Sequence, residues 1–575
     1  MIPRYAAAVF VTALSFWSAT VLAAPLPDAG SLLREQQQQQ PRLPDRLPAP
    51  DAETVERAPL TDSSIKVVVK GFRFSGITGM ATEDELQALV KGAIGKEQTL
   101  ADLQQLAKQV TRYLRDKGYF LARAYLPKQD VTEGVIEIAV LGGRVDGGAT
   151  VRIAQPARIR PGILQGMLDS GVKPGRPLHS SQLERSLMLI NDLPGVAAKG
   201  TLERGEVYGT TRVLLDVTEG PLLSGGISAD NFGNRYTGAW RGTGFLSIND
   251  PFGIGDQLSL SMTGAENLYQ GRAVYSAQLH PRGLKGTVSF SSLYYKLGSN
   301  LAALDANGYA DTIGASLSYP IIRSRTFSLW TSAGYEYRML NDYTAATLTK
   351  DRDIHSGTVD VSSSSLDSFG GGGLTSIRLA FTAGDLALGN RTNAQNDGIT
   401  AQTAGTYTKL GYSVARLQRL IDNLTLFGSV SGQLALNKNL DSSEEFILGG
   451  PSGVRSYPTG EGSGDEGHAF TLELRYDTPL PQSYGTLQLV GFGDAGTVTL
   501  HHKLWPNAVA IATAKNSYWL GGAGIGVNYS YKSLLALRGT WAHTIGSNDG
   551  RSLTGKDADN RSEDNRFWLQ ASVWF

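Results

Sequence analysis

Two glycine-rich stretches of the sequence match a pattern that binds nucleotide phosphates. Residues 491–496 and 462–467 both read G-x-G-x-x-G. In a dinucleotide site, a helix begins directly after such a loop, and the phosphate lies at the N-terminus of that helix. Here the first stretch continues as TVTLHHKLWP and the second as HAFTLELRYDTPL, which alternates apolar and polar residues as a strand does. We therefore expect no nucleotide to bind.

The sequence contains no recognisable motif for catalysis or for binding a metal ion. The sequence contains no Walker A, HExxH or GxSxG pattern, and it has no cysteine for a disulfide or a thiolate zinc site. Only His501 and His502 of the seven histidines are close in sequence, and neighbouring strand residues point to opposite faces. Basic and acidic residues both number 53, without the excess of positive charge typical of nucleic-acid binders. We expect no enzyme, metal, cofactor or nucleic-acid partner.

The composition and the first residues indicate an exported protein with many tight turns. Glycine accounts for 68 of 575 residues, against a typical share of about 7%, and charged residues for 18%, against about 25%. Arg4 precedes an apolar run over 6–22 that ends in small residues, which predicts a signal peptide over residues 1–23. An uncleaved anchor is the alternative. No later stretch of 18 apolar residues occurs, so the mature chain can cross a membrane only as strands.

Residues 24–64 are expected to hold a short plug-like helix and a linker. Residues 28–40 (DAGSLLREQQQQQ) can form the helix, and the repeated prolines after them cannot continue it. The alternative interpretation is an export leader without a role in the mature protein.

The next 83 residues, 65–147, are expected to form a small α/β domain. Thr82 and Thr99 are each followed three residues later by an acidic residue, the spacing of a capping box at a helix start. The expected elements, in order, are a strand over 65–76, helices that begin after Thr82 and Thr99, and strands over 121–127 and 134–145.

Residues 148–220 repeat the same order, β-α-α-β-β. The expected elements are a strand over 150–154, a helix around 163–168, a helix opened by Ser181-x-x-Glu184 and closed at 191–195, and strands over 201–205 and 210–220. A small sheet of this kind has an open edge to which an extended peptide can add as a strand. A duplicated, exported unit therefore suggests docking of a partner, whereas a generic α/β fold without a partner is the alternative.

Residues 221–575 show the pattern of a transmembrane β-barrel. Apolar residues recur with a period of two, for example in 470–477 and in the last strand, 567–575. One apolar and one polar face per strand is typical of strands between lipid and a polar lumen, although a soluble sandwich also alternates. These 355 residues give about 22 per strand and connection for 16 strands, and 14 or 18 strands fit nearly as well.

The two α/β units resemble POTRA domains, the periplasmic modules of the BamA/TpsB superfamily, through their element order and the NDLPGV turn. This resemblance implies a mostly β fold: an antiparallel barrel of about 16 strands over 221–575, preceded by POTRA 1 over 65–147 and POTRA 2 over 148–220.

Two stretches in the barrel resemble the signature motifs of that superfamily. One is Phe492-x-Asp494-x-Gly496, and the other is GGPSGVRSY at 449–457, in which Val454, Arg455 and Tyr457 match the family and Ser456 replaces a usual glycine. The resemblance places the second motif on a sixth extracellular loop (449–467) that folds into the lumen. The substitution of Ser456 puts the tight turn in question.

Strand parity gives independent support for a partner of Asp494. Leu487 and Leu489 should face lipid, so Gln488 and Asp494 should face the lumen. The planar guanidinium of Arg455 suits a two-pronged bond to a carboxylate. We name Arg455 and Asp494 the lumenal latch. The alternative is an exposed Arg455 and an Asp494 solvated by lumen water.

Residues at the start of the barrel and the last residue of the chain indicate which family within that superfamily the sequence resembles. The sequences SADNFG and NDPFGIGD resemble the opening hairpins of two-partner secretion transporters, the TpsB proteins that secrete haemolysins, filamentous haemagglutinins and contact-dependent toxins. The residues that carry this barrel-opening motif are Asp230, Asn231, Gly233, Asn249, Pro251, Gly255 and Asp256. Most of them are turn formers. In the family, a terminal aromatic residue such as Phe575 is the signal for outer-membrane assembly.

The resemblance implies a type V secretion transporter in the bacterial outer membrane, with its POTRA domains in the periplasm. Its partners would be an unfolded TpsA-type exoprotein, membrane lipid and, during biogenesis, the barrel assembly machinery. A barrel assembly factor of the same superfamily and a passive porin are the alternative functions. The sequence leaves open the identity of the client and the oligomeric state.

Overall fold

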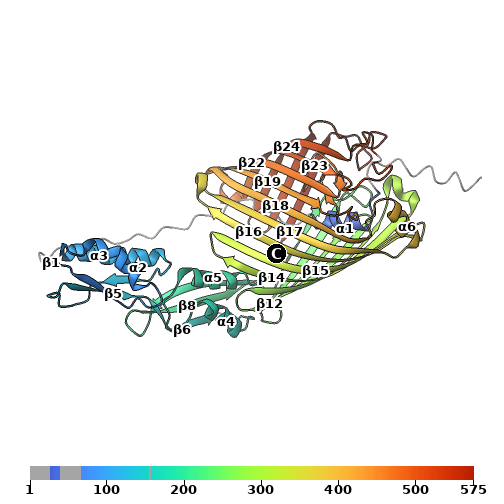
Figure 1. Ribbon diagram of the computed structural model, residues 1–575. Coiled ribbons are helices and arrows are strands. Elements are labelled where there is room, and N and C mark those ends of the chain that lie inside the picture. The colour runs from blue at the N-terminus through green and yellow to red at the C-terminus, as the bar shows by residue number, and fades with distance from the viewer. Residues whose placement is uncertain (1–25, 39–65, 154–156, 510) are drawn as a thin grey trace, which may run out of the picture.

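The computed structural model describes residues 26–38, 66–153, 157–509 and 511–575, which form a barrel with two small domains at one end (Figure 1). The expected signal peptide and the proline-rich part of the linker lie outside the described residues. No helix within the described ranges is both long and apolar enough to cross a membrane.

The first small domain contains two sheets. Its elements are β1 (Lys66–Val68), β2 (Gly71–Ser75), α2 (Glu83–Val90), η1 (Lys91–Ala93), β3 (Glu97–Thr99), α3 (Leu100–Asp116), β4 (Arg123–Tyr125) and β5 (Val135–Leu141). Both capping boxes, at Thr82 and at Thr99, are present. The single strand expected over 65–76 is wrong, because β1 pairs with β3 whereas β2 joins the sheet β2-β5-β4. The chain changes sheets where the Val69 carbonyl accepts from Gly95 and the Lys70 N–H donates to Gly134.

The second small domain has the expected element order. It consists of β6 (Arg144–Ile153), α4 (Pro161–Gly171), α5 (Ser180–Asn191), β7 (Val196–Arg204) and β8 (Thr210–Glu219). The sheet order is β6-β8-β7. Because β6 begins at Arg144, the strand expected over 134–145 ends early, at Leu141, and the expected boundary at 147/148 falls inside β6.

The helix start expected at Ser181 is also wrong. His179 caps α5 by accepting from the Ser181 N–H at 3.3 Å. Ser181 lies inside the helix and its hydroxyl contacts His179 Nδ1 at 2.9 Å, so it forms no capping box with Glu184. The Glu184 carboxylate instead accepts from the Arg325 N–H of the barrel at 2.6 Å. Glu184 therefore joins the second domain to the barrel instead of capping α5.

Sixteen antiparallel strands form one closed barrel, which confirms the strand number implied by the family resemblance. They are β9 (Leu223–Asp230), β10 (Arg241–Asn249), β11 (Gln257–Gly264), β12 (Leu268–His280), β13 (Leu284–Lys296), β14 (Ala306–Arg323), β15 (Phe327–Thr344), β16 (Thr347–Asp367), β17 (Gly373–Leu388), β18 (Gly405–Ile421), β19 (Leu424–Ala435), β22 (Glu466–Asp477), β23 (Thr486–Thr499), β24 (Ser517–Tyr531), β25 (Leu535–Thr544) and β26 (Asn565–Trp574).

The two faces of the wall differ as the alternation predicts. Leu472 and Leu489 are 57% and 44% exposed on the outside, whereas Gln488 and Asp494 are 3% and 4% exposed toward the lumen. Additional short elements lie in the connections of the barrel: η2 (Ser299–Leu304), η3 (Phe369–Gly371), α6 (Arg391–Ile399), β20 (Phe446–Ile447), β21 (Ser463–Gly464) and η4 (Gln482–Tyr484).

The barrel closes where its first strand, β9, meets its last strand, β26. Only five residue pairs are in register there, against eight between β9 and β10. The side chain of Asn231 extends this short ladder, since its amide donates to the Phe567 carbonyl at 2.8 Å and its oxygen accepts from the Leu569 N–H at 2.8 Å. At the end of the seam, these side-chain hydrogen bonds supplement one backbone bond, from the Asn231 N–H to the Leu569 carbonyl at 3.3 Å.

Replacing Asn231 by Ala should weaken the seam. Loss of its two hydrogen bonds should lower the free energy of unfolding by about 1–3 kcal/mol. Urea titration followed by tryptophan fluorescence measures this change. Asn300→Ala, in the exposed turn η2, is the matched control and should change stability by less than about 0.5 kcal/mol. Equal effects of the two substitutions would contradict the role of Asn231.

Candidate functional site

Residues 449–467 fold into the barrel and pack against its wall. Val454 is fully buried and Tyr457 is 3% exposed. Both belong to an apolar cluster with Leu448 and with Val498, Tyr518 and Leu520 of β23 and β24. Gly496 makes room for this contact, because a Cβ there would collide with the Leu448 side chain. Apolar packing therefore holds the loop in the lumen.

The structure brings Arg455 and Asp494 together in a two-pronged ion pair. Arg455 Nε lies 2.8 Å from Asp494 Oδ2, and Nη2 lies 2.9 Å from Oδ1. The backbone N–H of Arg455 also donates to Asp494 Oδ2, at 3.1 Å. The guanidinium lies 3.5 Å from the centre of the Phe492 ring, within the range of a cation–π contact. Arg455 is thus held by charge, hydrogen bonds and an aromatic face.

The sequence analysis did not predict that Arg455 has a second carboxylate partner, Glu473. Arg455 Nη1 donates to Glu473 Oε1 at 2.7 Å, and Arg475 Nε donates to the other oxygen of Glu473 at 2.8 Å. Thr471 donates to Asp494 Oδ1 at 3.0 Å. Thr471, Glu473 and Arg475 share the lumenal parity of β22, which is a signal that the sequence contains. Their alignment with Asp494 depends on the β22–β23 register, which pairs Thr471 with Asp494.

Ser456 does not disturb the loop. Its φ is not positive, so a glycine is not required at this position. Its hydroxyl donates to the Gly521 carbonyl at 3.3 Å, and its side chain fills the space that a Cβ at Gly522 would take. The departure from the family pattern is accommodated by a glycine on the facing strand, β24.

Trp568 connects the loop to the barrel seam. Its indole N–H donates to the Arg455 carbonyl at 2.7 Å, and its ring meets Phe232 edge to face at 5.9 Å. Thr459 of the loop donates to the Phe232 carbonyl at 3.0 Å. No sequence motif identifies Trp568, because its role depends on the closure of β26 against β9.

The barrel-opening motif separates into two groups. Asp230, Asn231 and Gly233 lie at the end of β9 far from the small domains, where Asp230 forms a buried ion pair with Arg241 at 2.7 Å. The remaining residues, Asn249, Pro251, Gly255 and Asp256, lie in or beside the β10–β11 turn that contacts the second small domain through Gly253 and Arg160.

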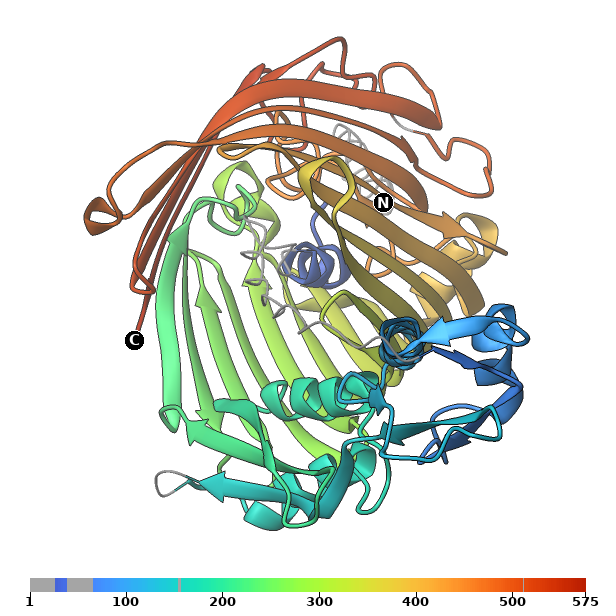
Figure 2. The same ribbon diagram turned by 90° about the vertical axis from the view of Figure 1, so that its left-hand side faces the viewer.

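The helix α1 (Ala29–Gln37) lies inside the ring of strands (Figure 2). It ends before the expected residue 40. Asp28 caps it and pairs with Lys350 and Arg352 of β16 at 2.8 and 3.1 Å. At its other end, Arg34 donates to the Glu445 carbonyl, and Gln36 accepts from Arg241, which is itself paired with Asp230. Polar contacts thus tie α1 to several parts of the wall.

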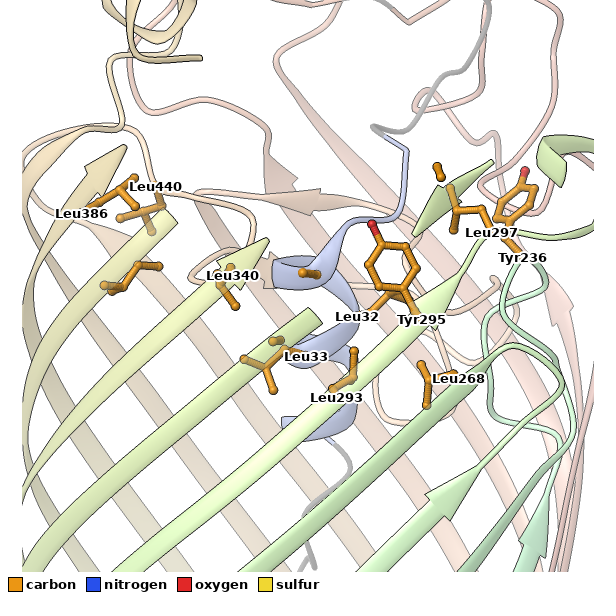
Figure 3. Packing of buried hydrophobic residues seen from close by; sticks show 14 of the residues in the cluster. Leu32, Leu33, Tyr236, Leu268, Leu293, Tyr295, Leu297, Leu340, Leu386 and Leu440 are labelled. Carbon is orange, nitrogen blue, oxygen red and sulfur yellow. The ribbon is translucent and has the colours of Figure 1, made fainter. Parts of the chain in front are cut away.

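One apolar face of α1 packs on the barrel wall (Figure 3). Ala29, Leu32 and Leu33 are at most 2% exposed and belong to one cluster with lumenal residues such as Leu293 and Tyr295 of β13. On another side of the helix, Glu35 is 5% exposed and accepts from Asn234 at 3.2 Å. Burial raises the pKa of Glu35 to about 8, against the lowering effects of Asn234 and Arg241.

The other candidate sites do not come together. Residues 491–496 lie within β23, and residues 462–467 lead into β22, so neither stretch opens a helix. His501 contacts the Ala508 carbonyl, whereas His502 pairs with Glu466. Among the described residues, no group of three or more His, Asp or Glu side chains is arranged to hold a metal ion.

Comparison with family models finds two matches. Residues 209–529 match the model described as haemolysin secretion/activation protein ShlB/FhaC/HecB, and residues 67–143 match the POTRA domain of the ShlB type. The first match spans more than half of the chain.

Individual relatives support the same assignment. The heme/hemopexin transporter protein HuxB of Haemophilus influenzae is 29% identical over 99% of both chains. The outer membrane transporter CdiB of Dickeya dadantii is 25% identical over 79% of this chain and 81% of its own. Among solved structures, CdiB from Escherichia coli has a TM-score of 0.72 at 21% identity, covering 94% of this chain and 95% of that one, which shows a shared fold.

Docking of α1 should weaken as the pH rises. The pKa of Glu35 is about 8 when α1 is docked, against an ordinary value near 4.5. Between these two pH values, Glu35 is protonated in the docked helix and ionised in the free helix. Docking is then strongest below about pH 4.5 and declines until about pH 8. Channel openings in planar bilayers should become more frequent over this range.

The variant Glu35→Gln keeps a hydrogen-bonding side chain without a titrating proton, and it should flatten the rise in openings. Glu563→Gln, a substitution of an exposed carboxylate, should leave the rise unchanged. A Glu35→Gln profile that superimposes on that of the parent protein would exclude Glu35 as the titrating group.

Proposed function

The chain belongs to the ShlB/FhaC/HecB family of haemolysin secretion/activation proteins, and on this basis we propose that it captures an unfolded exoprotein in the periplasm and passes it through its own barrel. The protein is a two-partner secretion (TpsB) transporter in the outer membrane, with POTRA domains on the periplasmic side. The observation that carries the proposed route is the position of α1, which occupies the lumen without belonging to the wall.

The two POTRA domains offer strand edges to a client. In the second domain the order β6-β8-β7 leaves β7 at an edge, and in the first domain the order β2-β5-β4 leaves β2 and β4 at the edges. An extended peptide that adds to such an edge is held mainly by main-chain hydrogen bonds. This mode suits a client without tertiary structure, because it needs no folded surface. Leu202 on β7 is 37% exposed and adds an apolar contact.

The lumen next to α1 suits an unfolded chain in transit. A cavity of about 520 Å³ is lined by Arg34 and Gln37 of the helix and by many wall hydroxyls, among them Ser316, Thr358 and Ser413. Hydroxyl groups hydrogen-bond a passing backbone in many orientations. Passage of a polypeptide requires α1 to leave, because the helix occupies the lumen beside this cavity and narrows the path.

The lumenal latch would keep loop six seated while α1 leaves. Its ion pair ties the loop to β23, and Glu473 ties it to β22. Loop six is also tied to the wall at both ends, through β19 and β22, whereas α1 is not part of any connection between barrel strands. Of the two segments, α1 is therefore the one expected to move.

The proposed export needs no nucleotide. Folding of the client outside the cell buries apolar surface, which stabilises the folded client by about 25 cal/mol per Å². This stabilisation opposes the return of the client through the barrel. The Haemophilus influenzae relative is named a heme/hemopexin transporter. An exoprotein that takes part in haem acquisition is accordingly the first client to test.

A photo-crosslinking residue at Leu202 should trap the client during secretion. The expected product is a covalent adduct between β7 and the unfolded exoprotein, detected on gels with antibodies against both proteins. The same residue at Thr347, in the β15–β16 hairpin at the opposite end of the barrel, should give no periplasmic adduct. Adducts at Thr347 but not at Leu202 would contradict capture at this edge.

Both Arg455→Lys and Asp494→Ala should insert at near-normal levels and secrete poorly. An ammonium group cannot reproduce the two-pronged contact. Neither substitution strands a charge, because lysine can still pair with a carboxylate and Arg455 keeps Glu473 as a partner when Asp494 is removed. The double variant Arg455→Lys/Asp494→Ala should secrete no worse than either single variant. Secretion of the exoprotein into the medium, relative to barrel level in the membrane, is the measurement.

A second two-pronged pair provides the control. Arg416 and Asp367 pair at 2.8 and 3.0 Å on β18 and β16 but are about one-third exposed and do not contact loop six. Arg416→Lys should therefore secrete normally. Additive defects in the Arg455/Asp494 cycle would show that the two residues act independently.

A further inference from the structure

The outer wall of the barrel has an apolar groove across β12, β13, β14 and β15. Its volume is about 570 Å³. The register aligns Tyr275, Val288, Ala315 and Tyr335 in one row across the four strands. The two tyrosines form the sides of the groove. Ala315 and the neighbouring Gly286 form its floor, and the groove is deep there because neither residue has a large side chain.

Hydrogen bonds fix both sides of the groove. The Tyr275 hydroxyl donates to Asp256 Oδ2 at 2.9 Å, and the Tyr335 hydroxyl lies 2.6 Å from His355 Nδ1. The two rings are thereby held by partners outside the groove, Asp256 in the β10–β11 turn and His355 on β16. A groove with fixed walls is pre-formed, which lowers the entropy cost of filling it.

The groove lies in the periplasmic half of the membrane. Tyr275 precedes the end of β12, His280, by five residues, which is about 17 Å along the strand at 3.4 Å per residue. For a strand tilted by about 40°, this is about 13 Å along the membrane normal, less than half of a hydrocarbon core of about 30 Å. Helix α5 of POTRA 2 lies next to this end of β12 and β14 (Figure 1). The lipids that reach this groove are therefore those of the periplasmic leaflet.

Two arginines lie at this end of the groove. Arg185 of α5 lies 5.8 Å from the ring centre of Tyr319 and donates to the carbonyls of Pro320 and Arg282 at 2.6 and 3.2 Å. Arg282, in the exposed β12–β13 turn, forms no side-chain hydrogen bond with any described residue. Arg185 also donates to the Ile321 carbonyl at 3.2 Å. Neither guanidinium has a carboxylate partner within the described part of the chain, so no described acidic side chain neutralises the two positive charges.

We propose that this groove and the two arginines bind an anionic phospholipid of the periplasmic leaflet. One acyl chain fills the groove between the tyrosines, and the phosphate lies against Arg185 and Arg282. A net negative headgroup is favoured over a zwitterionic one because no acidic side chain neutralises the two guanidinium groups. Since Arg185 belongs to POTRA 2 and Arg282 to the barrel, the bound phosphate also bridges these two parts. This binding is independent of the client.

Native mass spectrometry of the delipidated full-length protein tests the site. With phosphatidylglycerol and phosphatidylcholine of identical chains, one phosphatidylglycerol should be retained about tenfold to thirtyfold more strongly, from two basic contacts. Arg282→Gln, which removes a charge without breaking a hydrogen bond to a described residue, should reduce this preference about fivefold. Arg152→Gln, in POTRA 2 and paired with Asp216, is the control and should not reduce it.

Substitutions of the wall test the acyl chain. Ala315→Phe fills the groove and should weaken retention of phosphatidylglycerol, whereas Ala383→Phe, on the outer face of β17, should not. Equal retention of the two lipids, or an unchanged preference in Arg282→Gln, would show annular lipid only and overturn the proposal. A loss in Arg282→Gln without a loss in Ala315→Phe would overturn the groove as the site of the chain.

Discussion

A backbone N–H or carbonyl group without a partner costs several kcal/mol in lipid, and this cost decides the architecture of the membrane part. Sixteen strands satisfy it by closing on themselves. The last pairing, β26 with β9, is short, and Asn231 adds side-chain hydrogen bonds where backbone pairs end. Closure at this place also brings Trp568 of β26 against loop six, so the seam and the loop are parts of one structure.

The lumen of this barrel holds α1 and loop six, which are fixed by ion pairs as well as by apolar packing. Removing one partner of a buried ion pair costs more than the pair itself contributes, because an unpaired charge remains. Arg455 lies between Asp494 and Glu473, and Glu473 is shared with Arg475. This alternation of charges neutralises each group. Asp28 has the same arrangement between Lys350 and Arg352 at the start of α1.

The position of POTRA 2 follows from contacts with several periplasmic turns. Asp192 pairs with Arg323, Arg160 donates to Gly253, and Arg185 reaches both the β12–β13 turn and the end of β14. This domain is therefore held at the periplasmic end of the barrel. A client that binds an edge strand of POTRA 2 is already near the entrance. The short distance lowers the entropy cost of finding the lumen.

Local sequence patterns were sufficient to predict which strand residues face the lumen and where several helices begin. A period of two assigned residues such as Leu489 and Asp494 to opposite faces, and capping boxes located the helix starts after Thr82 and Thr99. These features depend on neighbours within a few residues, because strand and helix geometry repeats over that distance. Family motifs identified Arg455 and Asp494, and the structure places them in contact, although their role in transport stays a prediction. Only the tertiary structure decided the split of 65–76 between two sheets, the contact of Glu184 with the Arg325 N–H and the pairing of Glu473 with Arg455. Each of these depends on strand register, loop position or barrel closure, which join residues far apart in sequence and leave no periodic signal.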